Sequence, residues 1–445
     1  MRTELTVDLT RSREFLQEAL RYTPGGSPDG KWWEPNLIYA KSAKGCRLTD
    51  LDGNVYIDYH CGAGPIILGH AHPEVNQAVI DTIQGIGVQF ALPHEISIRL
   101  AKKLSECVPC AEMSVFCNAG TDAAHFAVRA ARTYTGRPKI VKFEGGYQGW
   151  ADPLAMSTNP RAPDFGSSVA PHTVPDTGGL LPDTLANTIV LPYNNLEAAA
   201  RRLEQDKGQI ACVFVEPYIH AFDIQAKPGF LEGLRALCDS TGVLLVFDEI
   251  VTGFRHGLGG MQLIEGITPD MAIVGKAMAN GYPISALVGK REYMNVIYPS
   301  GAAFFSGTFN GNPVSTAASL KTIEILERPG FYDRLYKSGD ILRAGINAAI
   351  DSLGVKARCL GYGSVWYLHF ESKAPENYRD VYYYRQNGGD ERERAYRDHM
   401  LNHGIFLYPA RGTRAYISAA HTERDIGSTV DAAVSFLTQH QQELR

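Results

Sequence analysis

Residues 243–249, Val-Leu-Leu-Val-Phe-Asp-Glu, and residues 271–277, Met-Ala-Ile-Val-Gly-Lys-Ala, decide the fold of this chain. Each stretch contains a short apolar run typical of a buried parallel strand. Asp248 ends the first run, and Lys276 follows the second. Because ligands bind at the carboxyl ends of parallel strands, the two stretches predict a site that combines an acid with an amine.

Lys276 has small neighbours on both sides, in the stretch 275–279, Gly-Lys-Ala-Met-Ala. A lysine at the end of a buried strand is poorly solvated, which lowers its pKa and leaves part of it as the free amine that attacks carbonyl groups. The predicted carbonyl is that of an aldehyde cofactor. Most lysines that follow strands are simply solvated, so the prediction depends on the other residues of the site.

The wider pattern predicts an α/β domain. Between residues 73 and 320, helical patterns alternate with short apolar runs rich in β-branched residues, which favours a mostly parallel sheet flanked by helices. The region before it carries an Asp-Gly-Asn turn at 52–54, which predicts an antiparallel hairpin, and residues 151–187 read as one long loop. The runs expected to form strands are 113–117, 140–143, 211–215, 243–247 and 271–274.

The domain boundaries follow from this change in pattern. Residues 1–72 are expected to form an N-terminal segment that joins the small domain, and residues 73–325 a large cofactor-binding α/β domain. Residues 326–445 mix helical stretches with the strand-like run 365–370, which predicts a smaller α+β domain.

Composition limits the classes of function. The chain has 445 residues, 44% of them hydrophobic, and a formal net charge of −5. The absence of a basic cluster argues against a nucleic-acid partner, and no apolar run approaches the ~18 residues of a membrane span. Because the chain starts without a secretory signal and its eight cysteines are scattered, we expect a cytoplasmic protein. Cys107-Val-Pro-Cys110 has no second pair of ligands, so no metal site is expected.

Two further motifs suit a phosphorylated cofactor. Residues 118–122, Asn-Ala-Gly-Thr-Asp, lie between a predicted strand and a predicted helix, so the N–H groups of Gly120 and Thr121 and the Thr121 hydroxyl can bind an anion. In residues 143–149, Phe-Glu-Gly-Gly-Tyr-Gln-Gly, the glycines allow a sharp turn that presents Tyr147 to a flat ring. The structural alternatives are an ordinary helix cap for the first motif and a loop anchor for Tyr147.

The acid and one later turn complete the set. An aspartate such as Asp248 holds a pyridine nitrogen in its protonated form, although Asp248-Glu249 can also cap a helix. The turn 306–313, Ser-Gly-Thr-Phe-Asn-Gly-Asn-Pro, offers hydroxyls for a phosphate or for helix capping. An anion site, an aromatic ring, an acid and an amine, in that order, fit one phosphorylated pyridine aldehyde, which is pyridoxal 5′-phosphate.

With these motifs the chain resembles the class III aminotransferases, pyridoxal-phosphate enzymes of fold type I, and within them most closely the glutamate-1-semialdehyde aminomutases. The resemblance implies a large domain with a seven-stranded, mostly parallel sheet and a small α+β domain built from both termini. It extends over nearly the whole chain, through the blocks 23–26, 51–59, 68–75, 118–122, 142–149, 247–255, 275–276 and 307–313.

The resemblance also implies a role for each residue. Lys276 forms the covalent link to the cofactor and then moves a proton, Asp248 holds the pyridine nitrogen, and Tyr147 stacks on the ring. Gly120 and Thr121 bind the phosphate. Two further residues complete the cofactor site: Thr308, which reaches the phosphate of the neighbouring subunit in an obligate homodimer with shared sites, and Val251, which stands where many members have a glutamine.

Three departures from the aminomutases concern the substrate. The segment 27–33, Ser-Pro-Asp-Gly-Lys-Trp-Trp, lacks the arginine that holds the substrate carboxylate in those enzymes, and Lys31 is the nearest replacement. Ala63 stands where they have a tryptophan, which predicts a roomier pocket. Arg414 takes the place of the arginine with which ω-aminotransferases bind 2-oxoglutarate or glutamate, and Glu216 matches the acid to which that arginine swings.

These departures predict an aminotransferase with two different substrates. A donor such as L-glutamate binds through Arg414, and a bulkier aldehyde or ketone, for example an oxidised amino sugar of an aminoglycoside pathway, accepts the amine beside Ala63. Trp32 and its neighbour Trp33 can face this acceptor or form a surface hairpin. One alternative is a glutamate-1-semialdehyde-type aminomutase or a β-amino acid aminotransferase that holds the carboxylate with Lys31 or Arg411. Another is a non-catalytic protein that binds pyridoxal phosphate.

Overall fold

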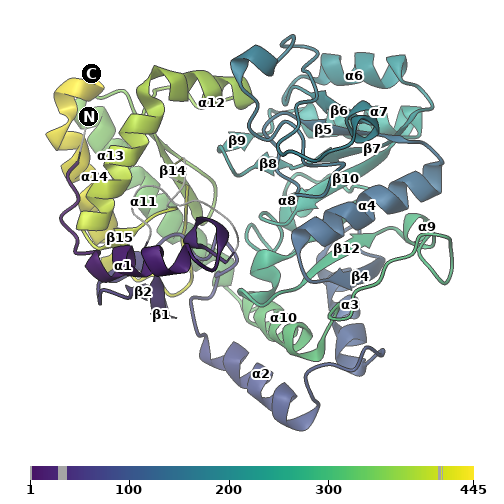
Figure 1. Ribbon diagram of the computed structural model, residues 1–445, viewed down its shortest axis with the longest axis horizontal. Coiled ribbons are helices and arrows are strands. Elements are labelled where there is room, and N and C mark those ends of the chain that lie inside the picture. The colour runs from purple at the N-terminus through teal and green to yellow at the C-terminus, as the bar shows by residue number, and fades with distance from the viewer. Residues whose placement is uncertain (1–2, 29–37, 409–411, 413) are drawn as a thin grey trace. The chain divides into compact units, whose positions relative to one another are not determined.

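The computed structural model describes residues 3–28, 38–408, 412 and 414–445, and the chain divides into two compact units (Figure 1). Unit 1 contains Met1–Pro73, Gly330–Ala374 and Tyr383–Arg445, and therefore both ends of the chain. Unit 2 contains Glu74–Pro329 and the short segment Pro375–Tyr382.

A seven-stranded sheet forms the centre of unit 2. Strand β10 pairs in parallel with β7 and β11, and β5 pairs in parallel with β6 and β7. Strand β12 is antiparallel to both of its neighbours, β11 and β4. In spatial order the strands are β4 (Met113–Cys117), β12 (Ser285–Gly289), β11 (Met271–Val274), β10 (Leu244–Glu249), β7 (Ile210–Val215), β5 (Lys139–Phe143) and β6 (Thr188–Leu191).

The sequence explains most of this sheet. Strands β7 and β10 are buried along their whole length, which is why they read as continuous apolar runs rather than as alternating ones. All five predicted strands are present, and the predicted mostly parallel α/β fold is confirmed. Strand β6 at one edge and the antiparallel β12 are not predicted from the sequence.

Helices flank the sheet of unit 2. Helix α4 packs against five of the strands and follows β4 directly (Figure 1). The loop 151–187 is broken by a 3₁₀ turn at Ala162–Asp164 and by α5, so it is less irregular than predicted. The helices are α2 (Pro73–Gly85), α3 (Glu95–Cys107), α4 (Gly120–Thr135), α5 (Pro182–Ala186), α6 (Leu196–Gln205), α7 (Phe230–Thr241), α8 (Gly260–Ile264), α9 (Arg291–Met294) and α10 (Pro313–Leu326).

Two smaller features of unit 2 position side chains near the strand ends. A short hairpin pairs β8 (Tyr218–Ile219) with β9 (Ile224–Gln225) just after β7. A 3₁₀ turn over Lys276–Ala279 follows β11. The core below these ends consists of alanines of α4 packed against apolar side chains of the central strands.

Unit 1 is a mixed α and β unit with two small sheets. The predicted hairpin forms between β2 (Arg47–Asp50) and β3 (Val55–Asp58), and Gly53 in its turn has a φ of 93°. The first sheet has the order β1-β2-β3-β15 and the second the order β13-β14-β16. The remaining strands are β1 (Ala40–Lys44), β13 (Arg358–Leu360), β14 (Val365–His369), β15 (Ile405–Phe406) and β16 (Ala415–Tyr416).

The helices of unit 1 include the long α11, which packs against α14. Helix α14 begins earlier than its apolar pattern suggests, because Thr422 and Asp425 form a capping box. The helices are α1 (Thr10–Ala19), α11 (Phe331–Leu353), α13 (Asp390–Asn402), α14 (Glu423–Gln439) and α15 (Gln441–Leu444), with a 3₁₀ turn at Pro24–Gly26. Helix α12 (Tyr378–Tyr384) and a π-helical turn at Arg385–Gly389 precede α13. Across the described residues, every helix is too short or too polar to span a lipid bilayer.

Candidate functional site

Asp248 lies where the sequence predicts it, near the carboxyl end of β10. Its side chain is buried, and its Oδ1 accepts a hydrogen bond from the N–H of Ile250 at 3.0 Å. Burial raises the pKa of Asp248 to about 7, while the nearby charge of Lys276 acts in the opposite direction. A buried carboxyl group of this kind is poised to pair with a cationic ligand atom.

Glu249, the neighbour of Asp248, has a structural role. Its carboxylate accepts hydrogen bonds from the N–H groups of Met261 and Gln262, both at 2.9 Å, and from the Thr252 hydroxyl. Glu249 therefore caps the first turn of α8 from a distance. The helix-cap alternative applies to Glu249, whereas among the described residues the carboxylate of Asp248 accepts a hydrogen bond only from the N–H of Ile250.

Lys276 follows β11 in a strained conformation. Its φ is 45°, in the left-handed region that non-glycine residues rarely adopt, and a glycine precedes it. The parallel pairing of β10 with β11 sets Asp248 beside Ile273, close to this turn. The positive charge of Lys276 opposes the rise in pKa of both Asp248 and Glu216, so the three side chains lie within electrostatic reach of one another.

The amino terminus of α4 offers donors for an anion. Within the described residues, the N–H groups of Gly120 and Thr121 and the Thr121 hydroxyl make no hydrogen bond. The side chain of Asp122 bonds back to the N–H of Ala119 at 3.1 Å and so leaves the two N–H groups between them open. Helix α4 has 16 residues, so its dipole also favours a negative charge here.

The turn that carries Tyr147 packs directly against this anion site. A Cβ added at Gly149 would lie 2.3 Å from Oγ1 of Thr121, so only glycine permits this approach. The backbone of Gly149 also has a φ of 89°. The sequence does not predict the contact of Gly149 with Thr121. The only signal for it was the glycine at the end of the 143–149 motif.

Tyr147 is presented to solvent from a firmly anchored backbone. Its side chain is 54% exposed, so part of the ring is accessible to solvent. Its N–H donates to Oε1 of Glu216 at 2.8 Å, and Nε2 of Gln148 donates to the same oxygen at 3.0 Å. The backbone of Tyr147 is therefore an anchor of the loop, and the stacking of its ring on a ligand stays a prediction.

Glu216 is a buried acid just after β7. Burial, followed by the negative charge of Asp248, raises its pKa to about 8, and Lys276 and Lys142 oppose this shift. Lys142 is itself fully buried, and its Nζ donates to the carbonyls of Gly146 at 3.0 Å and Leu154 at 2.8 Å. Sequence reasoning gave Lys142 no role, because a lysine inside the run Lys-Ile-Val-Lys-Phe carries no distinguishing signal.

The turn 306–313 lies near the start of α4. Nδ2 of Asn118 donates to Oδ1 of Asn310 at 3.1 Å, which joins this turn to the end of β4. Thr308 is exposed, and its carbonyl accepts a hydrogen bond from the side chain of Gln89. Val251 is half-buried in the turn after β10. A cavity of about 480 Å³ borders the turn and is lined by residues that include Gln89, His94, Phe305, Ser306, Thr308 and Asn310.

The residues predicted to select the substrate belong to unit 1, apart from Glu216. Arg414 is half-buried, with its guanidinium carbon 4.6 Å from the ring centre of Tyr408 and 5.8 Å from that of Tyr416. Among the described residues it forms no ion pair. The Tyr416 ring also lies 3.1 Å from where a Cβ on Gly64 would be, so Arg414 and the segment that contains Ala63 share one aromatic neighbour.

The structure shows less about the surroundings of the other residues predicted to bind the substrate. Ala63 has a φ of 67° and is half-buried in a turn. Trp32 lies outside the described residues, as do Lys31 and Arg411. The predicted exchange of Arg414 between a substrate and Glu216 stays a prediction.

Comparison with known proteins places this geometry in a family. The family model described as aminotransferase class III matches residues 30–420. The chain is 39% identical over 428 residues to glutamate-1-semialdehyde 2,1-aminomutase 2 of Brevibacillus brevis, with 95% of this chain and 97% of the relative covered.

Solved structures of transaminases superpose on nearly the whole chain. An omega-transaminase from Sphaerobacter thermophilus superposes with a TM-score of 0.92 at 33% identity, over 98% of this chain and 100% of that one. A transaminase solved with pyridoxal phosphate bound superposes with a TM-score of 0.87 at 28% identity, over 99% and 100% of the two chains. The names of these proteins do not mention an amino sugar, so the predicted amino-sugar acceptor gains no support from them.

Proposed function

The chain belongs to the class III aminotransferases, and on this premise we propose that it moves an amino group between two carbons of one small carboxylate-bearing substrate, as a 2,1-aminomutase does. Family membership confirms the expectation of a pyridoxal-phosphate enzyme over that of a non-catalytic binding protein. The observation that carries the choice of reaction is the match, over nearly the full length of both chains, to a glutamate-1-semialdehyde 2,1-aminomutase. This is the alternative reading of the sequence, and it replaces the amino-sugar reading as the first candidate.

The described residues of unit 2 fit the cofactor. The open N–H groups of Gly120 and Thr121 suit its phosphate, and the close approach that Gly149 allows brings the turn of Tyr147 to the same place. Buried Asp248 suits the ring nitrogen, and Lys276 suits the aldehyde. We assign the phosphate to Gly120 and Thr121, with Val251 near the ring.

Each group then has a defined task. Bound pyridoxal phosphate supplies an aldehyde that links to amines and a ring that withdraws electrons from the linked carbon. Asp248 accepts a hydrogen bond from the ring nitrogen and holds a proton there, and its burial excludes water from that bond. The amine of Lys276 carries a proton between the two substrate carbons. Tyr147 would stack on the ring and hold it in place.

Arg414 supplies the carboxylate contact. Its guanidinium forms no ion pair in the described part of the chain and lies against two tyrosine rings, which limit its motion and leave its donors for a ligand. Glutamate-1-semialdehyde has a single carboxylate, and such a group binds a guanidinium through two parallel hydrogen bonds. This assignment compensates for the arginine missing from 27–33.

A second candidate function is transfer between two molecules. L-glutamate donates the amine through Arg414, and a separate aldehyde or ketone accepts it. The small side chain at Ala63, beside the aromatic surroundings of Arg414, favours this candidate because it leaves room for a larger acceptor than an aminomutase requires. Both candidates use the same cofactor residues and differ only in whether the deaminated first substrate leaves, so that a second molecule takes up the amine, or stays and takes the amine back at another carbon.

One experiment separates the two candidates. The holoenzyme is incubated with glutamate-1-semialdehyde alone, and 5-amino-4-oxopentanoate, the product of moving the amine from carbon 2 to carbon 1, is measured. In a parallel sample, L-glutamate alone is added and the absorbance change from the aldehyde to the amine form of the cofactor is followed. The aminomutase predicts product in the first sample. Absence of product together with the absorbance change in the second sample rejects it in favour of the second candidate.

We also propose a homodimer, in line with the role expected of Thr308. Helix α2 and the chain after it expose several large apolar side chains, a pattern typical of an interaction surface. Exposed Phe304 and Phe309 flank Thr308. The remaining members of this surface are Ile80, Ile83, Ile86, Val88, Phe90 and Leu92.

A further inference from the structure

A buried carboxylate lies at the base of the turn that presents Tyr147. Glu144 directly follows β5 and precedes the two glycines of the turn, and its side chain is only 3% exposed. Burial raises the pKa of Glu144, and the guanidinium of Arg379 opposes this shift. A carboxylate at such a place needs a cationic partner if it is to stay charged.

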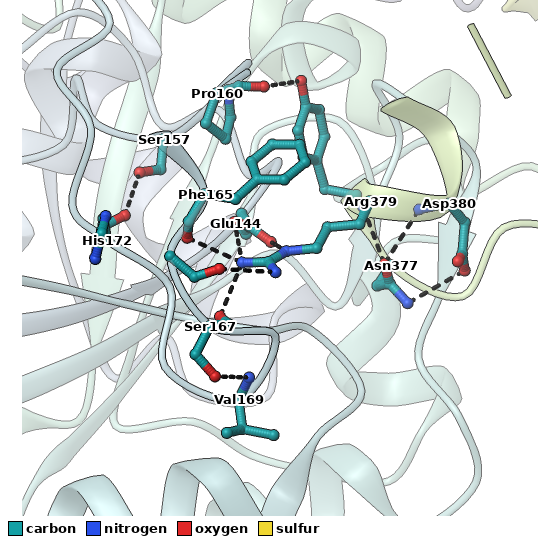
Figure 2. Close-up of polar contacts among 12 residues, drawn as sticks. Glu144, Ser157, Pro160, Phe165, Ser167, Val169, His172, Asn377, Arg379 and Asp380 are labelled. Atoms are coloured by element: carbon teal, nitrogen blue, oxygen red, sulfur yellow. Dashed lines mark hydrogen bonds and ion pairs between the residues drawn. The ribbon is translucent and has the colours of Figure 1, made fainter. Parts of the chain in front are cut away.

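Arg379 provides that partner from a distant part of the chain. Its Nε and Nη2 donate to the two carboxylate oxygens of Glu144 at 3.0 and 3.2 Å (Figure 2). The same guanidinium donates to three successive carbonyls, those of Phe165 at 3.0 Å, Gly166 at 3.3 Å and Ser167 at 2.9 Å. It also lies 4.8 Å from the ring centre of Phe165. One planar group thus joins the base of the Tyr147 turn to the loop beyond it.

The neighbour of Arg379 contacts the turn itself. A Cβ on Gly145 would lie 2.9 Å from Cβ of Tyr378, so Tyr378 packs directly on the backbone there. The hydroxyl of Tyr378 donates to the carbonyl of Pro160 at 2.9 Å. Tyr378, like Arg379, therefore connects the Tyr147 turn to the loop that follows it.

The segment that carries both residues is locally ordered. Oδ1 of Asn377 accepts hydrogen bonds from the N–H groups of Arg379 at 2.9 Å and Asp380 at 3.2 Å (Figure 2). Oδ2 of Asp380 accepts from the N–H of Glu376 at 2.9 Å. This arrangement caps the start of α12 and fixes the direction in which Arg379 leaves the backbone.

From these contacts we infer that Arg379 is a positioning residue that acts through Glu144 to hold the Tyr147 turn, and with it the ring of Tyr147, over the cofactor. The inference rests on the proposed function, because it assigns the ring of Tyr147 to the cofactor. The other anchors of the turn, Lys142 and Glu216, come from strands of the central sheet or the residue after one. The contacts of Arg379 and Tyr378 come instead from Pro375–Tyr382, the segment of unit 2 that is flanked in sequence by unit 1.

The test compares Arg379→Gln with the double variant E144Q/R379Q and with Lys227→Gln. The double variant leaves no unpaired buried charge and so guards against loss of folding. Lys227→Gln is the matched control, because it removes an exposed ion pair to Glu376 of the same segment, at 2.6 Å, without contact to the turn. The measurements are cofactor affinity, circular dichroism of the bound cofactor and amide hydrogen exchange.

We expect Arg379→Gln and the double variant to weaken cofactor affinity about tenfold and to reduce the visible circular dichroism, since each loses charge-assisted hydrogen bonds. In a Tyr147→Ala background the same change should alter affinity less than about twofold, because there is no ring left to position. Lys227→Gln should leave every measurement unchanged. An equal loss of affinity in both backgrounds would overturn the inference.

Hydrogen exchange decides the inference without reference to the cofactor. In the cofactor-free protein, Arg379→Gln should speed exchange at the amides of residues 145–147 as well as at 165–172. Faster exchange confined to 165–172 would show that Arg379 only fastens the loop, which contradicts the inference. A wild-type protein that does not bind pyridoxal phosphate would refute the proposed function and with it the role of the ring, whereas the exchange data would still show whether Arg379 holds the turn.

Discussion

At the scale of single residues, Lys276 is the residue for which the structure adds most to the sequence. Its backbone has a φ of 45°, and such strain persists only where surrounding structure enforces it. Buried residues follow it and a glycine precedes it. The sequence shows a lysine after a strand, and the structure adds the strained backbone and the influence of the Lys276 charge on the pKa values of Asp248 and Glu216.

Lys276→Ala should abolish catalysis. We expect turnover to fall by at least about a thousandfold, because both the covalent link and the proton carrier are lost. The absorbance of the covalently linked cofactor should disappear while the melting temperature changes little. Lys207→Ala, which alters a lysine that is 66% exposed, is the control and should retain full activity. Residual turnover above a tenth of the wild-type rate would exclude Lys276 as the catalytic amine.

Arg414 gives a prediction about substrate binding. Arg414→Ala should raise the KM for the carboxylate-bearing substrate by roughly 10- to 100-fold, the cost of losing a charge-assisted hydrogen bond pair, with a smaller effect on kcat. Arg414→Lys should recover only part of the loss, because an ammonium cannot bind both oxygens in a fork. Steady-state kinetics measure both effects. An unchanged KM in Arg414→Ala would show that another residue holds the carboxylate.

At the scale of elements, the buried strands are predictable and the small or polar ones are not. The runs that became β7, β10 and β11 are apolar throughout, which is the signal of a strand covered on both faces. Strand β12, Ser-Ala-Leu-Val-Gly, has small residues at both ends and gives no such signal. Helix α4 begins at Gly120, although Gly-Thr-Asp reads as loop, because Asp122 caps the helix from within.

The residues of the candidate site that lie at or near the ends of strands could be predicted from the sequence. Asp248 and Gly120 are found this way, since Asp248 lies near the end of β10 and Gly120 follows β4 closely. The ion pair of Glu144 with Arg379 joins residues 235 positions apart, and local patterns carry no information about such a partner. The same holds for the contact of Gly149 with Thr121, which depends on how two loops meet.

The approach of the Tyr147 turn to helix α4 can be tested by adding one methyl group. Gly149→Ala should weaken cofactor affinity by at least about tenfold and lower the melting temperature, because the new Cβ meets Thr121 and the residue has a φ of 89°. Gly178→Ala is the matched control in the following loop, since nothing lies within 4 Å of its added Cβ. Equal affinities for the two variants would mean that the turn and the helix need not touch for binding.

At the scale of the whole molecule, the buried acids of the site should make stability depend on pH. The pKa of Asp248 is raised to about 7 and that of Glu216 to about 8, well above the values of about 4 that carboxyl groups have in unfolded chains. The folded state therefore retains protons that the unfolded state has released, so the free energy of unfolding decreases as pH rises through this window. Above pH 8 the lowered pKa of Lys142 acts in the opposite direction.

We therefore expect the melting temperature of the cofactor-free protein to fall as the pH rises from 6.5 to 8, above the range in which the lowered pKa values of His369, His399 and His421 act in the opposite direction. Each group changes the free energy of unfolding by about 1.4 kcal/mol for each pH unit over which its protonation differs between the two states. Glu216→Gln should flatten the dependence, because the amide does not titrate. Thermal melts at constant ionic strength provide the test. A melting temperature that rises over the same range would contradict the assigned pKa directions.

The central claim is that the strand ends of unit 2 bind pyridoxal phosphate covalently through Lys276. Borohydride reduction of the holoprotein, followed by digestion and peptide mass spectrometry, measures this directly, because reduction makes the link permanent. We predict that the label is found on the peptide that contains Lys276. A label on Lys142, the other lysine buried near Asp248 and Glu216, or the absence of any label, would contradict the account.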